Sequence, residues 1–259
     1  MINRKQILFG INDDEDKTFL SKMCDKADKA IKTTVPMYTG FLTPKEQMLL
    51  KSKLTPYVDI SFFGGYENFE RSIACFTPLG FDYIELKYPI SALKISTKNK
   101  SVFSHRDYLG SILSLGVKRE TVGDIIITSQ YAIVLCQSEI ADYFIYNLTK
   151  IARANVNVEY TDIRNDDIPQ RQFKERDLTV SSLRLDCVIS GCINKSRGIS
   201  SEYIEKGLVS VNYECIKNNS RQINDGDIIS VKGMGKMIVN TNMELTKKGR
   251  YHISVKQYI

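Results

Sequence analysis

The chain has 259 residues, 42% of them hydrophobic and 25% charged, which is enough for two or three small domains with buried cores. Its six cysteines form no CxxC pair and only two histidines are present, which argues against a zinc site and against a disulfide framework. We therefore expect free thiols in the reducing cytoplasm, with no metal and no cofactor. The polar N-terminus and the shortness of every apolar run predict neither a signal peptide nor a membrane span.

The formal charge is unevenly distributed along the chain. Residues 176–259 hold 13 Lys and Arg against 8 Asp and Glu, whereas residues 1–175 hold 23 against 22. The total of +6 therefore comes almost entirely from the last third. This pattern fits a basic module that attracts phosphate, but an excess of this size also arises by chance.

Residues 1–80 predict an N-terminal α+β subdomain. The spacing in residues 16–34 indicates one amphipathic helix. A second helix follows Thr43, since Pro44 suits its first position and Glu46 completes a capping box. Residues 57–79 predict two strands around a Gly-Gly turn region.

Residues 81–163 predict a domain of β-α-β-β-α-β order. The expected elements are a strand at 82–90 that continues irregularly past Pro89, a helix between Ser104 and Gly116, a hairpin at 123–136, a helix at 138–152 and a strand at 155–162. Ser104 and Asp107 are spaced as a capping box. This order is that of a ferredoxin-like, RRM-like fold. The segment has no pattern of base-stacking aromatics like that of an RRM, so it can also be scaffold alone.

Residues 164–177 are highly charged and contain one proline, which predicts a linker. Residues 178–259 then predict two short helices followed by a small curled sheet. The whole chain is thus expected to be an α+β protein.

One stretch of the C-terminal region carries a strong resemblance. Arg184-Leu185-Asp186 opens the first helix, Ser196-Arg197 opens the second, "VSVN" forms the strand at 209–212, and Gly226-Asp227 precedes a later strand. In this order the features resemble the S4 domain, the αL RNA-binding module of ribosomal protein S4 and many RNA-modifying enzymes. Tyr213 departs from the pattern, because many S4 domains have glycine there.

The residue spacing agrees with an RNA-binding role for this stretch. Leu185, Val188, Ile189 and Cys192 form a buried stripe, and Arg184 falls outside it. Ser196 or Ser200 can cap the second helix, whose first N–H groups favour an anion. We expect an RNA-contact surface made of Arg184, Lys195, Ser196, Arg197 and Lys206, with Asp186 as an orienting group. The alternative is a solvated helix face on which Arg197 pairs with Asp186.

The resemblance extends to most of the chain. Residues 104–125 ("SHRDYLGSILSLGVKRETVGDI"), "FGGYENFERS" and "TKKGR" are similar to the YlmH family of S4-domain proteins of Gram-positive bacteria. That resemblance implies an N-terminal α+β subdomain, an RRM-like middle domain and a C-terminal S4 domain. It also implies binding to the large ribosomal subunit with peptidyl-tRNA during quality control of stalled translation, and a link to the cell-division gene neighbourhood.

Four residues at the two ends of the helix expected near 104–116 form a possible second RNA contact: His105, Arg106, Lys118 and Arg119. The alternative is surface solvation and capping, since cations near a helix C-terminus are favourable for dipole reasons alone.

Enzyme interpretations find little support in the motifs. Pseudouridine synthases carry a catalytic Asp in an Arg-Leu-Asp context, but the instance here lies inside the S4-like stretch and no second one is present. The "HRD" at 105–107 has the same three residues as a kinase catalytic loop. The match is accidental, because that loop needs Asn five residues after the Asp and Ile112 stands there.

We therefore predict a monomeric, non-enzymatic protein that binds rRNA or tRNA on the ribosome, at the large subunit, and does not bind a membrane. The competing hypothesis is a protein-interaction adaptor in cell division, which salt dependence distinguishes from phosphate binding.

Overall fold

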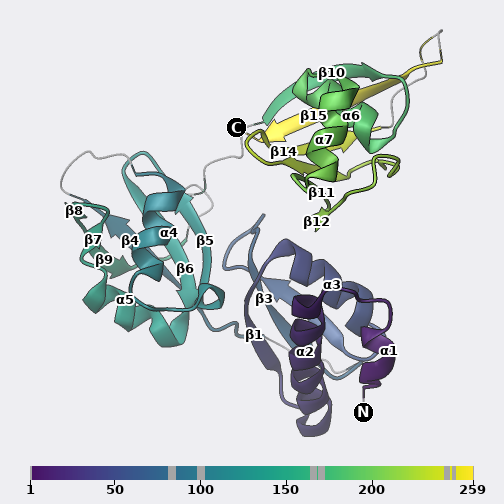
Figure 1. Cartoon of the computed structure of the whole chain (residues 1–259). Helices are drawn as coiled ribbons and strands as arrows, with labels where there is room; N and C mark the ends of the chain where they lie inside the picture. The colour runs from purple at the N-terminus through teal and green to yellow at the C-terminus, as the bar shows by residue number, and fades with distance from the viewer. Residues whose placement is uncertain are drawn as a thin grey trace. The chain divides into compact units, whose positions relative to one another are not determined.

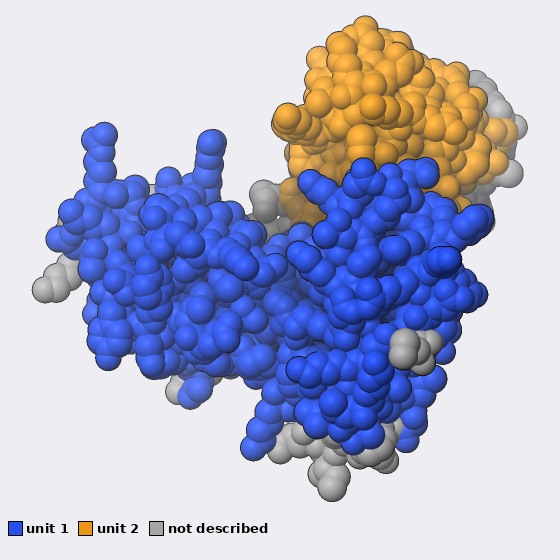
Figure 2. All heavy atoms as spheres, turned by 60° about the horizontal axis from the view of Figure 1, so that its bottom comes forward, with its two compact units in different colours: residues 1–169 blue, residues 170–259 orange. Residues whose placement is uncertain are grey.

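The computed structural model describes residues 2–80, 86–97, 103–163, 168, 173–241, 246 and 249–258. It divides the chain into two compact units, residues 1–169 and residues 170–259, which Figure 2 colours separately. None of the helices in the described ranges is long and apolar enough to cross a bilayer.

The first half of unit 1 is a three-stranded antiparallel sheet with helices. Its elements are α1 (Arg4–Leu8), α2 (Asp14–Thr33), β1 (Met37–Leu42), α3 (Pro44–Leu54), β2 (Asp59–Phe63) and β3 (Ser72–Thr77), with strand order β1-β3-β2. The predicted capping box is confirmed: the Thr43 hydroxyl accepts from the Glu46 N–H at 3.3 Å, and the Glu46 carboxylate accepts from the Thr43 N–H at 2.6 Å. The expected first helix and the strand pair are also present, whereas β1 was not predicted.

The second half of unit 1 is a four-stranded antiparallel sheet of order β5-β6-β4-β9. Its elements are β4 (Ile90–Ser96), α4 (His105–Leu113), η1 (Arg119–Thr121), β5 (Val122–Ile127), β6 (Tyr131–Gln137), η2 (Ser138–Ile140), α5 (Ala141–Asn147), β7 (Lys150–Ile151), β8 (Ala154–Asn155) and β9 (Asn157–Tyr160). The Ser104–Asp107 capping box and the β5–β6 hairpin confirm the sequence predictions.

Two boundaries in this half differ from expectation. The first strand begins at Ile90, directly after the proline that cannot donate to a ladder, and residues 82–85 of the expected strand lie outside the described residues. The helix expected at 138–152 ends at Asn147, because the chain turns into the short β7–β8 pair through Ala152, whose φ is +52°.

Both faces of this four-stranded sheet carry buried side chains. On β6, Val134 packs into the cluster that includes α4 and α5, whereas Ile133 and Leu135 pack on the opposite face against Phe41 of β1 and Ile73 of β3. Alternate side chains of one strand thus enter two different cores. The first half of unit 1 covers the sheet face that the helices leave open.

Two glycines permit this close approach between the halves of unit 1. A Cβ on Gly123 would lie 2.6 Å from the Phe41 ring, and one on Gly40 would lie 2.8 Å from the Glu120 carbonyl oxygen. Real Cβ atoms essentially never come so close, so both positions need a residue without a side chain. The halves therefore pack as one body.

Unit 2 is a six-stranded antiparallel sheet with two helices on one side (Figure 1). Its elements are β10 (Phe173–Val180), α6 (Leu185–Ile193), α7 (Arg197–Glu205), β11 (Val209–Val211), β12 (Glu214–Cys215), β13 (Ile228–Val231), β14 (Gly235–Asn240) and β15 (Tyr251–Tyr258), with order β10-β15-β14-β13-β11-β12. One core joins the helices to the sheet, and the predicted stripe of Leu185, Val188, Ile189 and Cys192 lies within it.

The segment expected as a linker, 164–177, is in part a strand. Residues from Phe173 onward belong to β10, which pairs with β15 from Phe173↔Tyr258 to Val180↔Tyr251. Its charged side chains look like linker composition, but Glu175 and Asp177 point away from the core while Leu178 and Val180 pack into it. Residues 164–167 and 169–172 of the expected linker lie outside the described residues.

Candidate nucleic-acid interface

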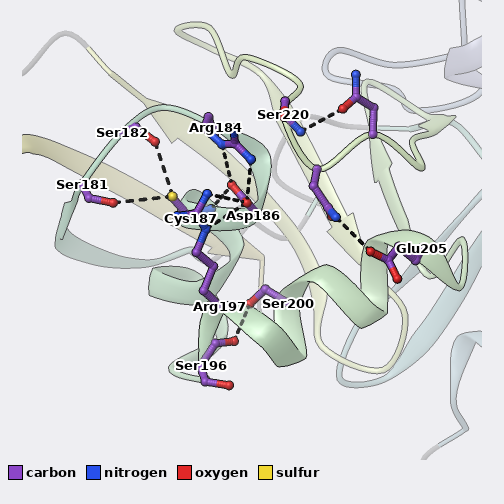
Figure 3. A network of polar contacts seen from close by, with 12 residues as sticks. Ser181, Ser182, Arg184, Asp186, Cys187, Ser196, Arg197, Ser200, Glu205 and Ser220 are labelled. Carbon is purple, nitrogen blue, oxygen red and sulfur yellow. Dashed lines mark hydrogen bonds and ion pairs between the residues drawn. The ribbon is translucent and has the colours of Figure 1, made fainter.

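The start of α6 and the start of α7 meet at one buried carboxylate, that of Asp186 (Figure 3). The Arg184 Nε and Nη2 donate to the two Asp186 oxygens at 3.2 and 3.0 Å. The Arg197 Nε and Nη2 both donate to Asp186 Oδ2, at 2.9 and 2.8 Å. The Asp186 side chain is only 4% exposed, whereas those of Arg184 and Arg197 are 34% and 55% exposed. One inward anion therefore holds two cations at the surface.

The electrostatics of Asp186 fit this arrangement. Burial alone would raise the pKa of Asp186, but hydrogen bonds from Arg184, Arg197 and Cys187 outweigh it and lower the pKa to about 2. The hydrogen bond between Arg184 and Asp186 also raises the pKa of Arg184. Asp186 is thus ionised at neutral pH, and with one carboxylate between two guanidinium groups the local formal charge is +1.

The orientation of Arg184 is also fixed from its own backbone. The segment from Leu183 to Leu185 runs beside residues 221–223, where the Leu185 N–H donates to the Arg221 carbonyl at 2.8 Å and the Ile223 N–H to the Leu183 carbonyl at 2.9 Å. Arg184 bridges to Gln222 in the same way. This backbone pairing leaves the arginine side chain directed along the surface toward Asp186.

The other predicted contact residues are placed at different points of the helix pair. Ser196 caps α7 as predicted, its hydroxyl accepting from the Ile199 N–H at 3.4 Å. Lys195 lies next to it in the turn, and the Ser190 hydroxyl donates to its carbonyl at 2.7 Å. Lys206 is at the far end of α7, nine residues after Arg197 and therefore roughly 13 Å from it along the helix axis. Its ammonium pairs with the Glu202 carboxylate at 3.1 Å. The structure thus brings together four of the five residues and leaves Lys206 apart.

The ion pair of Arg197 with Asp186, which the sequence suggested as the alternative to RNA contact, is present. It does not use all of the donors. A guanidinium has five N–H groups, and the bonds to Asp186 occupy those on Nε and Nη2, so the Nη1 groups of both arginines make none of these bonds. The pairing and an anion contact are therefore compatible.

Sequence reasoning missed Arg221. It is an exposed cation whose carbonyl accepts from the Leu185 N–H at the start of α6. The polar turn region around it looked like an ordinary loop. The signal was the presence of a cation in a segment that pairs with the first residues of α6, and that pairing is visible only in the folded chain.

The second predicted set is divided between structural and exposed residues. Arg119 donates to the Val122 carbonyl, and desolvation together with nearby Arg71 lowers its pKa to about 10. Desolvation, and then the charge of Arg119, lowers the pKa of His105, so His105 is neutral at pH 7. Arg106 is exposed, and the Lys118 side chain is 81% exposed and lies 4.0 Å from Glu120. Arg119 thus supports the fold, whereas Arg106 and Lys118 are accessible.

Metal binding has no support in the described part of the chain, which contains no group of three or more His, Cys, Asp or Glu that could hold an ion. The described cysteines are all free thiols, and five of the six are buried.

Comparison with known proteins identifies the family. A Bacillus subtilis protein named "Ribosome-associated protein quality control protein P2" is 32% identical over 222 residues, which cover 85% of this chain and 86% of that protein. A family model described as "Putative RNA-binding domain in YlmH" matches residues 84–165. This chain belongs to the YlmH family.

A solved YlmH structure has a similar fold. The "Cell division protein ylmH from Streptococcus pneumoniae" aligns with a TM-score of 0.50 and 24% identity, covering 59% of this chain and 94% of that one. The YlmH RNA-binding match spans the four-stranded sheet of unit 1 and includes His105, Arg106, Lys118 and Arg119, whereas Arg184 and Arg197 lie outside it.

Proposed function

We propose that this YlmH-family protein binds rRNA or tRNA on the large ribosomal subunit, in quality control of stalled translation. The observation that carries the proposal is the pair Arg184 and Arg197, fixed side by side on the buried carboxylate of Asp186. The name of the Bacillus subtilis relative, which is ribosome-associated, supports the same direction.

The physical argument rests on preorganisation. A free arginine side chain loses up to about 2 kcal/mol of rotamer entropy when it is ordered by a ligand. Asp186 has already ordered both arginines in the free protein, with hydrogen bonds of 2.8–3.2 Å. Planar guanidinium groups also match phosphate oxygens geometrically. The pair therefore suits an RNA backbone held in one register.

We also propose that unit 2 is an S4 domain and that the second half of unit 1 is RRM-like. Two helices on one side of a curled sheet support the first assignment. The order β5-β6-β4-β9 supports the second, because it places the first and third strands of β-α-β-β-α-β in the centre. The β7–β8 pair is an insertion into that order.

In an RRM the open sheet face stacks bases. Here Phe41 and Ile73 pack against Ile126, Ile133 and Leu135 on that face, so stacking on this part of it is blocked. We propose that any RNA contact of the YlmH middle region lies at Arg106 and Lys118 instead, with His105 as a neutral hydrogen-bonding group. The protein would act as a monomer in the cytoplasm and without catalysis.

The test is co-sedimentation of the full chain with separated ribosomal subunits at low and high salt. Wild type is compared with Arg184→Ala/Arg197→Ala and with a control, Lys29→Ala/Lys32→Ala, which removes two exposed charges of α2 in unit 1. We expect salt-sensitive pelleting with the large subunit, weakened about tenfold to a hundredfold by the arginine variant and unchanged in the control.

Equal pelleting of wild type and the arginine variant would refute the site assignment. Binding to division proteins without any salt-sensitive pelleting would instead favour the adaptor hypothesis, which the name of the Streptococcus pneumoniae protein supports.

A further inference from the structure

The sheet of unit 2 has a second face, opposite α6 and α7. Met237 of β14 and Val255 of β15 are buried in the core with the helices. Because side chains alternate along a strand, Lys236 and Tyr258 point to the other side. The alternation on β10 places Phe173 on that side too, since Val180 packs into the core. We call this side the outer face.

Aromatic rings and one lysine form a row across the outer face. The Phe173 and Tyr258 ring centroids are 4.9 Å apart. The Lys236 ammonium lies 5.5 Å from the Tyr258 centroid and 5.1 Å from that of Tyr213, within cation–π range of both. The row therefore runs from β10 over β15 and β14 to the turn after β11.

Tyr213 occupies a strained position in that turn. Asn212 has a φ of +49° and Tyr213 a φ of +68°, the left-handed region that favours glycine. A bulky residue there costs roughly 1–2 kcal/mol relative to an unstrained conformation. Glycine, the residue common at this point in S4 domains, would form the turn without strain. A tyrosine therefore stands where the backbone conformation favours glycine. The contact of its ring with Lys236 places the ring on the outer face.

A hollow of about 450 Å³ adjoins the row. Its floor is a register line of small outward residues, Cys215, Ser210 and Ser230, and two lysines, Lys232 and Lys236, stand at its rim. No acidic side chain is among the residues that line it. The volume falls within the range of about 300–1,000 Å³ of small-ligand pockets, so one nucleobase fits.

We propose that the outer face of unit 2 binds single-stranded RNA. One unpaired base stacks on the Tyr213 ring, a neighbouring base enters the hollow, and the phosphate between them meets Lys236, which contacts Tyr213 and also lines the hollow. Unpaired bases stack on aromatic rings with little regard to sequence. The +5 charge of residues 176–259 and the absence of acids at the hollow favour a polyanion over a protein segment. This surface lies on the opposite side of the sheet from the Arg184–Arg197 pair, so it extends the proposed function without depending on that pair.

The experiment measures binding of a fluorescein-labelled poly(U) oligonucleotide to the full chain by fluorescence anisotropy. Poly(U) is chosen because its bases are unstacked. Tyr213→Gly should weaken binding about tenfold by removing one stacking ring. Its thermal midpoint should not fall, because glycine relieves the strained turn. Tyr213→Phe keeps the ring and should bind like wild type, and Phe9→Ala, an exposed aromatic of unit 1, serves as the matched control.

Each outcome decides the proposal. Wild-type affinity in Tyr213→Gly, or no measurable binding of poly(U) by wild type, overturns it. If unit 1 or a second copy of the chain covers the outer face, Tyr213→Gly leaves poly(U) binding unchanged and alters the sedimentation coefficient, which also overturns it. The Arg184→Ala/Arg197→Ala variant separates the two surfaces: loss of ribosome pelleting with retained poly(U) binding supports both, whereas retained pelleting refutes only the helix site.

Discussion

The two larger sheets of this chain, of four and six strands, have different environments. The β5-β6-β4-β9 sheet of unit 1 is covered on one face by α4 and α5 and on the other by Phe41 and Ile73. The β10-to-β12 sheet of unit 2 is covered on one face by α6 and α7, and its other face carries Lys236, Tyr258 and a hollow.

The difference indicates how the two halves divide their roles. The unit 1 sheet packs against side chains on both faces, and residues 1–175, which contain it, have a net charge of only +1. A sheet with one open face leaves polar and aromatic groups available, and here it occurs in the part of the chain with a net charge of +5. We therefore propose that phosphate contact lies mainly in unit 2.

The largest expected effect comes from removing the centre of the unit 2 site. Asp186→Ala leaves Arg184 and Arg197 facing each other without their shared anion, and it should lower the free energy of unfolding of unit 2 by about 2–4 kcal/mol. Calorimetry should show the unit 2 transition moving down while that of unit 1 stays in place. A joint shift of both transitions would contradict the division into two units.

Gly123→Ala tests how tightly the unit 1 sheet packs against Phe41. The new Cβ would lie 2.6 Å from the Phe41 ring, so we expect unit 1 to lose about 1–3 kcal/mol of stability. Gly110→Ala in α4 is the matched control, because nothing lies within 4 Å of its Cβ, and it should stabilise by about 0.5–1 kcal/mol. Equal behaviour of the two variants would mean that the second sheet face is not tightly packed.

Acid titration sharpens the account of Asp186. Its folded pKa of about 2 lies below the ordinary 3.8, so the unfolded chain takes up the proton first. The stabilisation is therefore complete above about pH 5 and is lost as the pH falls toward 2, with a size on the order of 2 kcal/mol. Asp186→Asn cannot titrate, so its unit 2 stability should lack this component between pH 5 and 2 in urea unfolding measured by circular dichroism.

The smallest effect is expected at Lys206. Its exposed i,i+4 pair with Glu202 contributes about 0.3–0.5 kcal/mol, and it lies at the opposite end of α7 from Ser196. Lys206→Ala should therefore weaken large-subunit pelleting much less than Arg197→Ala does. If the two variants weaken it equally, the RNA surface runs along the whole of α7.

Local signals in the sequence predicted the local structure well. The capping boxes at Thr43 and Ser104, the cap at Ser196 and the buried stripe of α6 each depend on residues within one or two turns, and each is present. The S4-like order of Arg184, Asp186 and Arg197 could be recognised for the same reason, since its parts lie close together in the chain.

Local sequence signals do not predict features that depend on contacts between distant parts of the chain. The sequence predicts a linker over residues 173–177, the first part of β10, because the partner strand β15 lies more than 70 residues later and the outward side chains are charged. The packing of Phe41 against the unit 1 sheet and the pairing of residues 221–223 with residues 183–185 likewise arise from contacts between distant segments. Tyr213 was visible as a departure from a pattern, but only its φ and its contact with Lys236 show where the ring lies.

Hydrogen–deuterium exchange of the full chain, with and without large ribosomal subunits, tests most directly whether the starts of α6 and α7 bind the ribosome. The account predicts protection at the starts of α6 and α7, residues 184–199, and no change in the strands Ile90–Ser96 and Tyr131–Gln137 of unit 1. Protection confined to those two strands, with residues 184–199 unchanged, would contradict it.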